Sequence, residues 1–225
     1  LSSSSAASDV YKRQGHRRSC ANLDEGSRHR RPAWARCHEK GVIAMSLREL
    51  RIYGDPVLGS RAEEISKFDA GLRALASDML ETMDNAGGVG LAANQVGILK
   101  RIFVYDCSHT QSGLRGAIVN PVWTPVGEQQ QTGPEGCLSI PGISAETTRF
   151  NQVFVSGQDI EGRPVSMVAS GLMARCIQHE TDHLDGVLFL QRLEAPVRKE
   201  AMRAIRESEW FNACLLYTSD AADEE

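Results

Sequence analysis

The segment 178–183 contains the pattern H-E-x-x-H, in which His179 and His183 stand four residues apart. On a helix, this spacing places both imidazoles on one face, where they can bind a single metal ion. Glu180 then lies beside the metal, where a carboxylate can transfer protons. A catalytic site of this kind takes three protein ligands and keeps one position open for water, so a third donor is required.

Candidate donors for the third position exist on both sides of this pattern. Upstream, Cys137 lies in the segment 134–142, where glycines and prolines favour a loop that brings the thiol close to a metal. Cys107 and Cys176 are interpreted instead as small buried hydrophobes. No histidine follows His183, and the downstream candidates are all acidic: Glu194, Glu200, Glu207 and Glu209.

A further candidate is the glycine-rich segment 87–97. Its glycines permit the backbone to approach a ligand closely, and the amide of Gln95 could donate a hydrogen bond to a developing oxyanion. The segment follows a predicted helix and lacks the full glycine spacing of a dinucleotide-binding fingerprint, which excludes that function. A tight structural turn is the alternative interpretation.

The elements that must position these groups are indicated by hydrophobic periodicity. Apolar residues at helical spacing predict a helix from Phe68 to Met83 that ends before Gly87. Helical spacing returns from Gly171 to Asp185, around the histidines, and a last helix is predicted over 195–210. Between the helices, turn residues separate four β-type runs, at 101–106, 116–120, 152–156 and 164–168.

This order of elements predicts the fold class. A helix, then strands, then helices, without regular βαβ alternation, indicates an α+β fold. We expect mainly antiparallel strands packed around a central metal-binding H-E-x-x-H helix, with an N-terminal helix and a C-terminal helix. Residues 45–213 show no internal repeat and no low-complexity linker, which favours one domain.

Composition excludes several classes of protein. The chain has 225 residues, of which 41% are hydrophobic and 24% charged, and no apolar run is long enough to cross a membrane. A formal net charge of -4 gives no overall basic field for nucleic acid. Six scattered cysteines do not make a disulfide scaffold, and a thiolate ligand requires a reducing compartment.

The two ends of the chain differ from its middle. Residues 1–44 carry nine Lys or Arg against four Asp or Glu, without hydrophobic periodicity. Residues 4–14 match the translation of a sequencing-adaptor oligonucleotide, and 214–224 match its complementary strand, so we interpret 1–14 and 214–225 as adaptor-derived. We then expect 15–44 to be upstream read-through and Met45 to be the natural start. The alternative for the basic end is an organellar transit peptide.

Three motifs in this order resemble those of the peptide deformylase family. They read G-V-G-L-A-A-N-Q at 88–95, E-G-C-L-S at 135–139 and Q-H-E-T-D-H-L-D-G at 178–186. The segment 51–58 is also similar to the start of that family's domain. The resemblance covers essentially all of 45–213, departs at no motif position and is of the bacterial type.

The resemblance implies a metal-dependent hydrolase that removes the N-formyl group from the formylmethionine of nascent polypeptides and releases formate. It implies one divalent metal ion, Fe(II) rather than Zn, Ni or Co, bound by Cys137, His179 and His183, and attack by a metal-bound hydroxide. Its implied catalytic groups are Glu180 as the proton carrier and, as oxyanion donors, Gln95 and the backbone N–H of Leu138. The implied substrate contacts are Val89 and Gly90 for the peptide backbone and Ile177, near His179, for the methionine pocket.

The sequence also leads to expectations about partners and cellular location, and it leaves two alternative functions open. The family resemblance implies a formyl-methionyl nascent peptide as substrate, the ribosome near its exit tunnel as a partner, a monomer, and no nucleic-acid or membrane binding. We expect the bacterial cytoplasm, with an organelle as the alternative. The rival enzyme is a zinc endopeptidase with an acidic ligand after the motif, and the rival without catalysis is a metal-stabilised homologue.

Overall fold

The computed structural model describes residues 46–110 and 112–212. The interpretations of 1–44 and 214–225 therefore lie outside the described residues. The helices are α1 (Ala70–Ala86), α2 (Gly171–Leu184) and α3 (Ala195–Glu207), with short 3-10 turns at η2 (Pro56–Gly59), η3 (Ala93–Val96) and η4 (Phe189–Arg192). The strands are β1 (Gly90–Ala92), β2 (Ile102–Asp106), β3 (Arg115–Pro125), β4 (Gln130–Cys137), β5 (Ile140–Phe150), β6 (Gln152–Gln158) and β7 (Pro164–Ser170).

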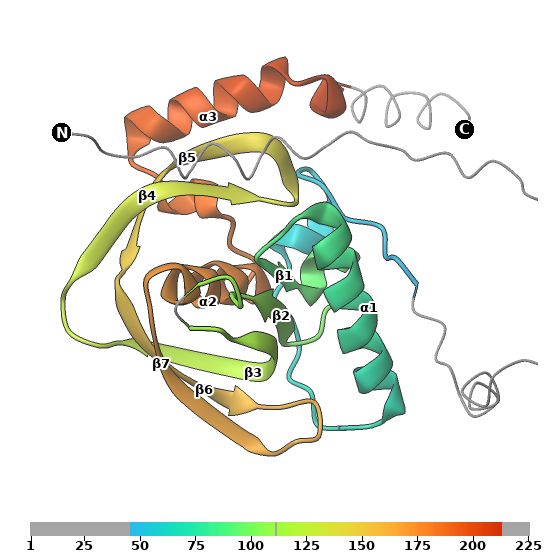
Figure 1. The fold of residues 1–225 in the computed structure, drawn as a ribbon. Helices are drawn as coiled ribbons and strands as arrows, with labels where there is room; N and C mark the ends of the chain where they lie inside the picture. The colour runs from blue at the N-terminus through green and yellow to red at the C-terminus, as the bar shows by residue number, and fades with distance from the viewer. Residues whose placement is uncertain (1–45, 111, 213–225) are drawn as a thin grey trace, which may run out of the picture. The chain divides into compact units, whose positions relative to one another are not determined.

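The strands form two antiparallel sheets. One has five strands in the order β1-β2-β3-β6-β7, and the other is the hairpin β4-β5. Figure 1 shows α2 between these two sheets, with α3 lying over the hairpin and α1 at the side of the molecule near β1 and β2. The predicted α+β fold with a central helix is therefore confirmed.

Helix α1 ends before Gly87, as the sequence predicts, and begins at Ala70, two residues after the predicted start at Phe68. The side chain of Asp69 accepts the backbone N–H of Leu72 at the start of the helix, which satisfies a donor that has no partner within the helix. Gly87 ends the helix in the left-handed conformation, with φ of 70°, which glycine adopts without strain. The apolar face of α1 packs on β2, in a cluster that includes Met79, Met83 and Val104.

Helix α2 differs from an ordinary amphipathic helix. Every residue from Met173 to Leu184 is buried, including polar and charged ones, although an amphipathic pattern marks the sequence. The apolar side packs on the large sheet, in a cluster with Phe103 and Ile118. The polar side faces the β4-β5 hairpin, whose buried charged groups provide partners for it.

Strands β4 and β5 correct one expectation. The segment 134–142 was expected to be a loop, yet only Leu138 and Ser139 form a turn, and the flanking residues belong to paired strands. The sequence did not indicate this strand because glycine and proline weaken a strand pattern, and β4 contains Gly133, Pro134 and Gly136. The hairpin therefore holds Cys137 at the end of β4, directly before the turn.

Candidate metal centre and active site

Helix α2 presents both histidines on one side, as the four-residue spacing predicts. The ring centroids of His179 and His183 lie 4.9 Å apart, and the two rings meet edge to face. Burial lowers the pKa of His183 well below its usual value, so its imidazole is neutral, the form that binds metals. Among the described residues, His183 Nδ1 has no hydrogen-bond partner.

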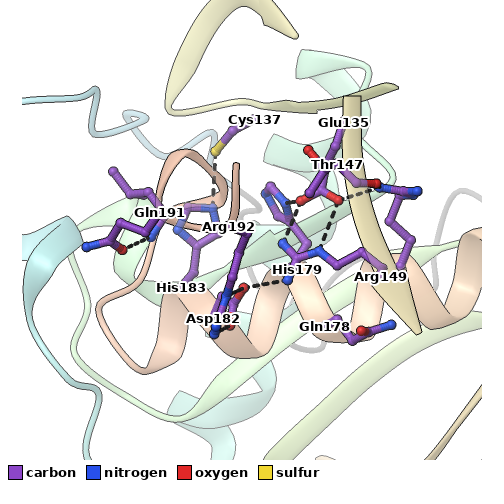
Figure 2. A network of polar contacts seen from close by, with 12 residues as sticks. Glu135, Cys137, Thr147, Arg149, Gln178, His179, Asp182, His183, Gln191 and Arg192 are labelled. Atoms are coloured by element: carbon purple, nitrogen blue, oxygen red, sulfur yellow. Dashed lines mark hydrogen bonds and ion pairs between the residues drawn. The ribbon is translucent and has the colours of Figure 1, made fainter. Parts of the chain in front are cut away.

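Cys137 reaches this pair from the end of β4. Its Sγ lies 3.1 Å from His183 Nε2, and the ligand atoms of Cys137, His179 and His183 all lie within 4.8 Å of one another. Figure 2 shows the thiol pointing from the hairpin toward the histidines on α2. One thiolate and two imidazoles fit a four-coordinate transition metal with one open position.

The candidate third ligands lie in different parts of the structure. Within the part of the chain that the structure describes, the cluster contains Cys137 and none of the downstream glutamates. Glu200 and Glu207 lie on α3, which packs over the outer side of β5. Cys107 and Cys176 are buried in the core, as the sequence analysis expects.

Glu135 fixes the orientation of His179. The Nδ1 of His179 lies 2.7 Å from Glu135 Oε1, so Nδ1 donates to the carboxylate and Nε2 is left for a metal. Burial opposes the charge on Glu135, but hydrogen bonds from His179 and Arg149 lower the pKa of Glu135 far below its usual value. Burial likewise disfavours a proton on His179, yet hydrogen bonds to Cys137 and Glu135 raise the pKa of His179 well above its usual value, so a metal that binds at Nε2 must displace the proton there.

Glu180 lies on the next position of α2 with only 4% of its surface exposed. Its Oε2 has no hydrogen-bond partner among the described residues. Burial raises the pKa of Glu180 to about 7, a value suited to exchanging protons near neutral pH. Gly90 makes room for this side chain, because a Cβ there would lie 2.8 Å from the carboxyl carbon of Glu180.

Gln95 lies on η3 with its amide held in one orientation. Its Oε1 accepts the backbone N–H of Ala92 at 2.9 Å. Its Nε2 donates to Ser139 Oγ at 3.2 Å and contacts Cys137 Sγ at 3.5 Å. The structure therefore brings the amide nitrogen of Gln95 to the group formed by Cys137, His179 and His183, beside the turn that contains Leu138.

The expected substrate contacts fall into two groups. Val89 and Gly90 are partly exposed at the start of β1, which is an edge strand of the large sheet. Ile177 is 0% exposed and packs in the core between α2 and that sheet. Its contribution to a methionine pocket stays a prediction.

A buried network of charged residues, which the sequence patterns did not predict, lies behind Cys137, His179 and His183. Arg149 donates to Glu135 and also to Asp182 Oδ2 at 2.6 Å, and Arg192 donates to the other oxygen of Asp182 at 2.6 Å. A second arginine, Arg175, donates to Glu135 at 2.7 Å. Glu135 and Asp182 fall inside the two ligand motifs, which was the available signal.

The chain is similar in sequence and in structure to members of one known family. A family model described as polypeptide deformylase matches residues 47–199. Peptide deformylase 1 of Corynebacterium efficiens is 65% identical over 168 residues, which cover 75% of this chain and 99% of that protein. The crystal structure of a peptide deformylase from Legionella pneumophila matches with a TM-score of 0.68 and 34% identity, covering 75% of this chain and 98% of that one. A peptide deformylase from Synechococcus elongatus, solved in complex with actinonin, matches with a TM-score of 0.66 and 41% identity, covering 72% and 90%.

Proposed function

The chain belongs to the polypeptide deformylase family and removes the N-formyl group from nascent peptides, and we propose that Cys137, His179 and His183 hold the metal ion for this hydrolysis. The observation that carries the assignment of ligands is the meeting of one thiol and two imidazoles from two separate elements, β4 and α2. When bound, a divalent metal supplies a nucleophile near neutral pH by lowering the pKa of water. The donor set accepts Fe, Zn, Co or Ni, and we propose Fe(II).

Glu180 is the proton carrier in this proposal. Its Oε2, for which the described part of the chain offers no hydrogen-bond partner, can accept a proton from the attacking water, and burial keeps the carboxylate basic enough to do so. The same carboxyl then delivers the proton to the departing amine of the peptide. Gly90 holds the geometry, because the absence of its side chain lets Glu180 pack against β1.

Gln95 and Leu138 stabilise the oxyanion that develops on the formyl group. The Nε2 of Gln95 is directed at the cluster by hydrogen bonds at both ends of the amide. The backbone N–H of Leu138 is offered by the turn directly after Cys137. Fixed donors of this kind stabilise a developing charge without reorganising during the reaction.

The edge of β1 aligns the substrate backbone. Among the described residues, β1 pairs with β2 alone, and we propose that its other edge accepts an extended peptide as an added strand. Val89 and Gly90 are the residues that this peptide would lie beside, close to Glu180. Ile177 is proposed to shape the methionine pocket from the core beneath it.

The cellular setting is also part of the proposal. A thiolate ligand remains reduced in the cytoplasm of bacteria, where we place the enzyme as a monomer that meets its formyl-methionyl substrates at the ribosome. Within the described residues, no helix is both long and apolar enough to span a membrane. Anaerobic purification followed by elemental analysis tests the metal, and Fe as the bound ion is the expected result.

The experiment that tests the ligand assignment compares two cysteines. Formate release from a formyl-Met-Ala-Ser peptide and metal content are measured for the full chain, Cys137→Ala and Cys107→Ala. We expect Cys137→Ala to lose both metal and activity. Cys107→Ala, which removes a buried thiol outside the cluster, should keep both. Full activity in Cys137→Ala would contradict the proposal and favour a downstream ligand.

A further inference from the structure

Glu135 is the most heavily bonded carboxylate of the buried network. Its Oε1 receives His179 Nδ1 at 2.7 Å and Arg149 Nη2 at 2.6 Å. Its Oε2 receives Arg149 Nε at 3.1 Å and Arg175 Nη1 at 2.7 Å. All four residues are at most 8% exposed, so water competes little for these hydrogen bonds.

Arg175 is buried in this network, unlike the arginine at its outer end. The side chains of Arg149 and Arg175 are 5% and 9% exposed, whereas that of Arg192, which pairs with Asp182, is 49% exposed. Burying a charge is costly unless it gains compensating contacts. The interior position of Arg175 therefore points to a role in the network.

The contacts of Arg175 indicate what that role is. It lies four residues before His179 on α2, so both side chains extend from the same helical face to the same carboxylate. Its Nη1 also donates to the backbone oxygen of Thr147 on β5 at 2.9 Å. Arg149, in contrast, is shared between Glu135 and Asp182. Arg175 thus ties the ligand helix to the β4-β5 hairpin through Glu135 itself.

We propose that Arg175 is a positioning residue for metal binding, which holds the carboxylate of Glu135 so that His179 keeps its Nε2 directed at the metal. The inference rests on the proposed metal site and extends it to a residue that touches neither metal nor substrate. Without Arg175, Oε2 of Glu135 would keep one donor only, and the carboxylate could rotate away from His179. Loss of such an outer contact typically weakens metal binding by about 10- to 100-fold.

The test measures metal affinity rather than activity. Zn²⁺ and Co²⁺ dissociation constants are determined by chelator competition for the full chain, Arg175→Met and Arg175→Lys, with the visible spectrum of the Co²⁺ form as a second readout. Arg101→Met is the matched control, because Arg101 is a buried arginine that braces the other end of α2 through Leu184 O and Asp185. Thermal unfolding of each metal-free variant separates loss of fold from loss of metal.

We expect Arg175→Met to bind either metal about 10- to 100-fold more weakly, with an altered Co²⁺ spectrum. Arg175→Lys keeps the charge without the planar fork, so it should lie between Arg175→Met and the parent. Arg101→Met should bind as the parent does. An affinity of Arg175→Met within twofold of the parent, or tighter, would overturn the inference.

Two further outcomes are decisive. If Arg175→Met does not fold, Arg175→Lys decides: binding more than threefold weaker than the parent supports the inference, and unchanged binding overturns it. Metal binding by the parent that does not require Cys137 would contradict the proposed metal site. Binding that requires Cys137 but is unaffected by Arg175→Met would contradict only the role of Arg175.

Discussion

Two ion-pair clusters in this molecule use the same residue types in opposite surroundings. Behind the three candidate metal ligands, the Arg149–Glu135 pair joins side chains that are only 5% and 4% exposed. On the surface, Arg115 bridges Asp84 on α1 and Asp106 on β2, and its side chain is 36% exposed. The N–O distances are similar, at 2.6 Å for Arg149–Glu135 and 2.7 Å for Arg115–Asp84. Distance therefore does not distinguish the clusters, but burial does.

This difference in burial determines what the removal of a charged side chain costs. Solvent screens the surface cluster, so its removal leaves hydrated groups behind. Solvent does not hydrate the buried cluster in this way, so removing one member leaves a charged partner buried with fewer compensating contacts. The buried carboxylate of Glu135 also accepts a hydrogen bond from His179. Its loss should therefore weaken metal binding as well as the stability of the fold.

The largest effect is expected for Glu135→Gln. This change leaves Arg149 and Arg175 without their carboxylate and should lower the free energy of unfolding by about 3–5 kcal/mol. Metal content should fall as well, because His179 loses its acceptor. Urea unfolding and elemental analysis measure the two effects, and a variant that keeps both the parent's stability and its metal would refute the claimed importance of burial.

Gly90→Ala should impair catalysis while leaving the metal bound. The new Cβ would lie 2.8 Å from both Cys176 Sγ and the carboxyl carbon of Glu180, so the carboxylate must shift. A displacement of about 1 Å at a reacting group can cost about 100-fold in rate. We expect a loss of this size in kcat/KM with unchanged metal content. Unimpaired kcat/KM would show that the position of Glu180 is not critical.

The acid dependence of stability should reveal the contribution of Glu135 in the buried cluster. Hydrogen bonds keep the pKa of folded Glu135 far below the value of 4.5 for an unperturbed glutamate. The unfolded chain therefore binds more protons once the pH falls below about 4.5, and the stability contributed by Glu135 declines as pH falls. The free energy of unfolding of the parent should drop faster than that of Glu135→Gln, by up to about 1.4 kcal/mol per pH unit. Urea titrations at pH 6, 4.5 and 3 measure this difference, and parallel curves would contradict it.

Arg115→Met should have the smallest effect. The exposed cluster should contribute at most about 1 kcal/mol, which corresponds to a shift in Tm of about 2–4 °C for a domain of this size. High salt should remove most of the difference between the variant and the parent. Calorimetry at low and high ionic strength is the measurement. A larger and salt-independent loss would mean that the surface pairs resemble the buried ones.

Much of the site was predictable from the sequence because the chemistry is local. H-E-x-x-H needs only a helix to bring its histidines together, and the apolar spacing around 171–185 indicated that helix. The helix that ends at Gly87 was predicted for the same reason. The resemblance to a known family supplied Cys137 as third ligand, a choice that residue patterns alone left open.

The rest depended on tertiary contacts that no pattern records. β4 contains two glycines and a proline, so its pairing with β5 overrides local propensity. Arg149 and Arg175 stand 14 and 40 residues from Glu135, and nothing near either of them indicates a shared carboxylate. The burial of α2 from Met173 to Leu184 also follows from having a sheet on each side, which a single helix pattern does not reveal.

The role of Glu180 as the proton carrier is tested most directly by the activity of Glu180→Gln in the metal-loaded full chain. Formate release from formyl-Met-Ala-Ser is compared with that of the parent carrying the same metal at the same occupancy. Removing a general base typically costs about 100- to 10,000-fold, and we expect kcat/KM to fall within that range with metal retained. Activity of Glu180→Gln within tenfold of the parent would contradict the central role given to this buried carboxylate.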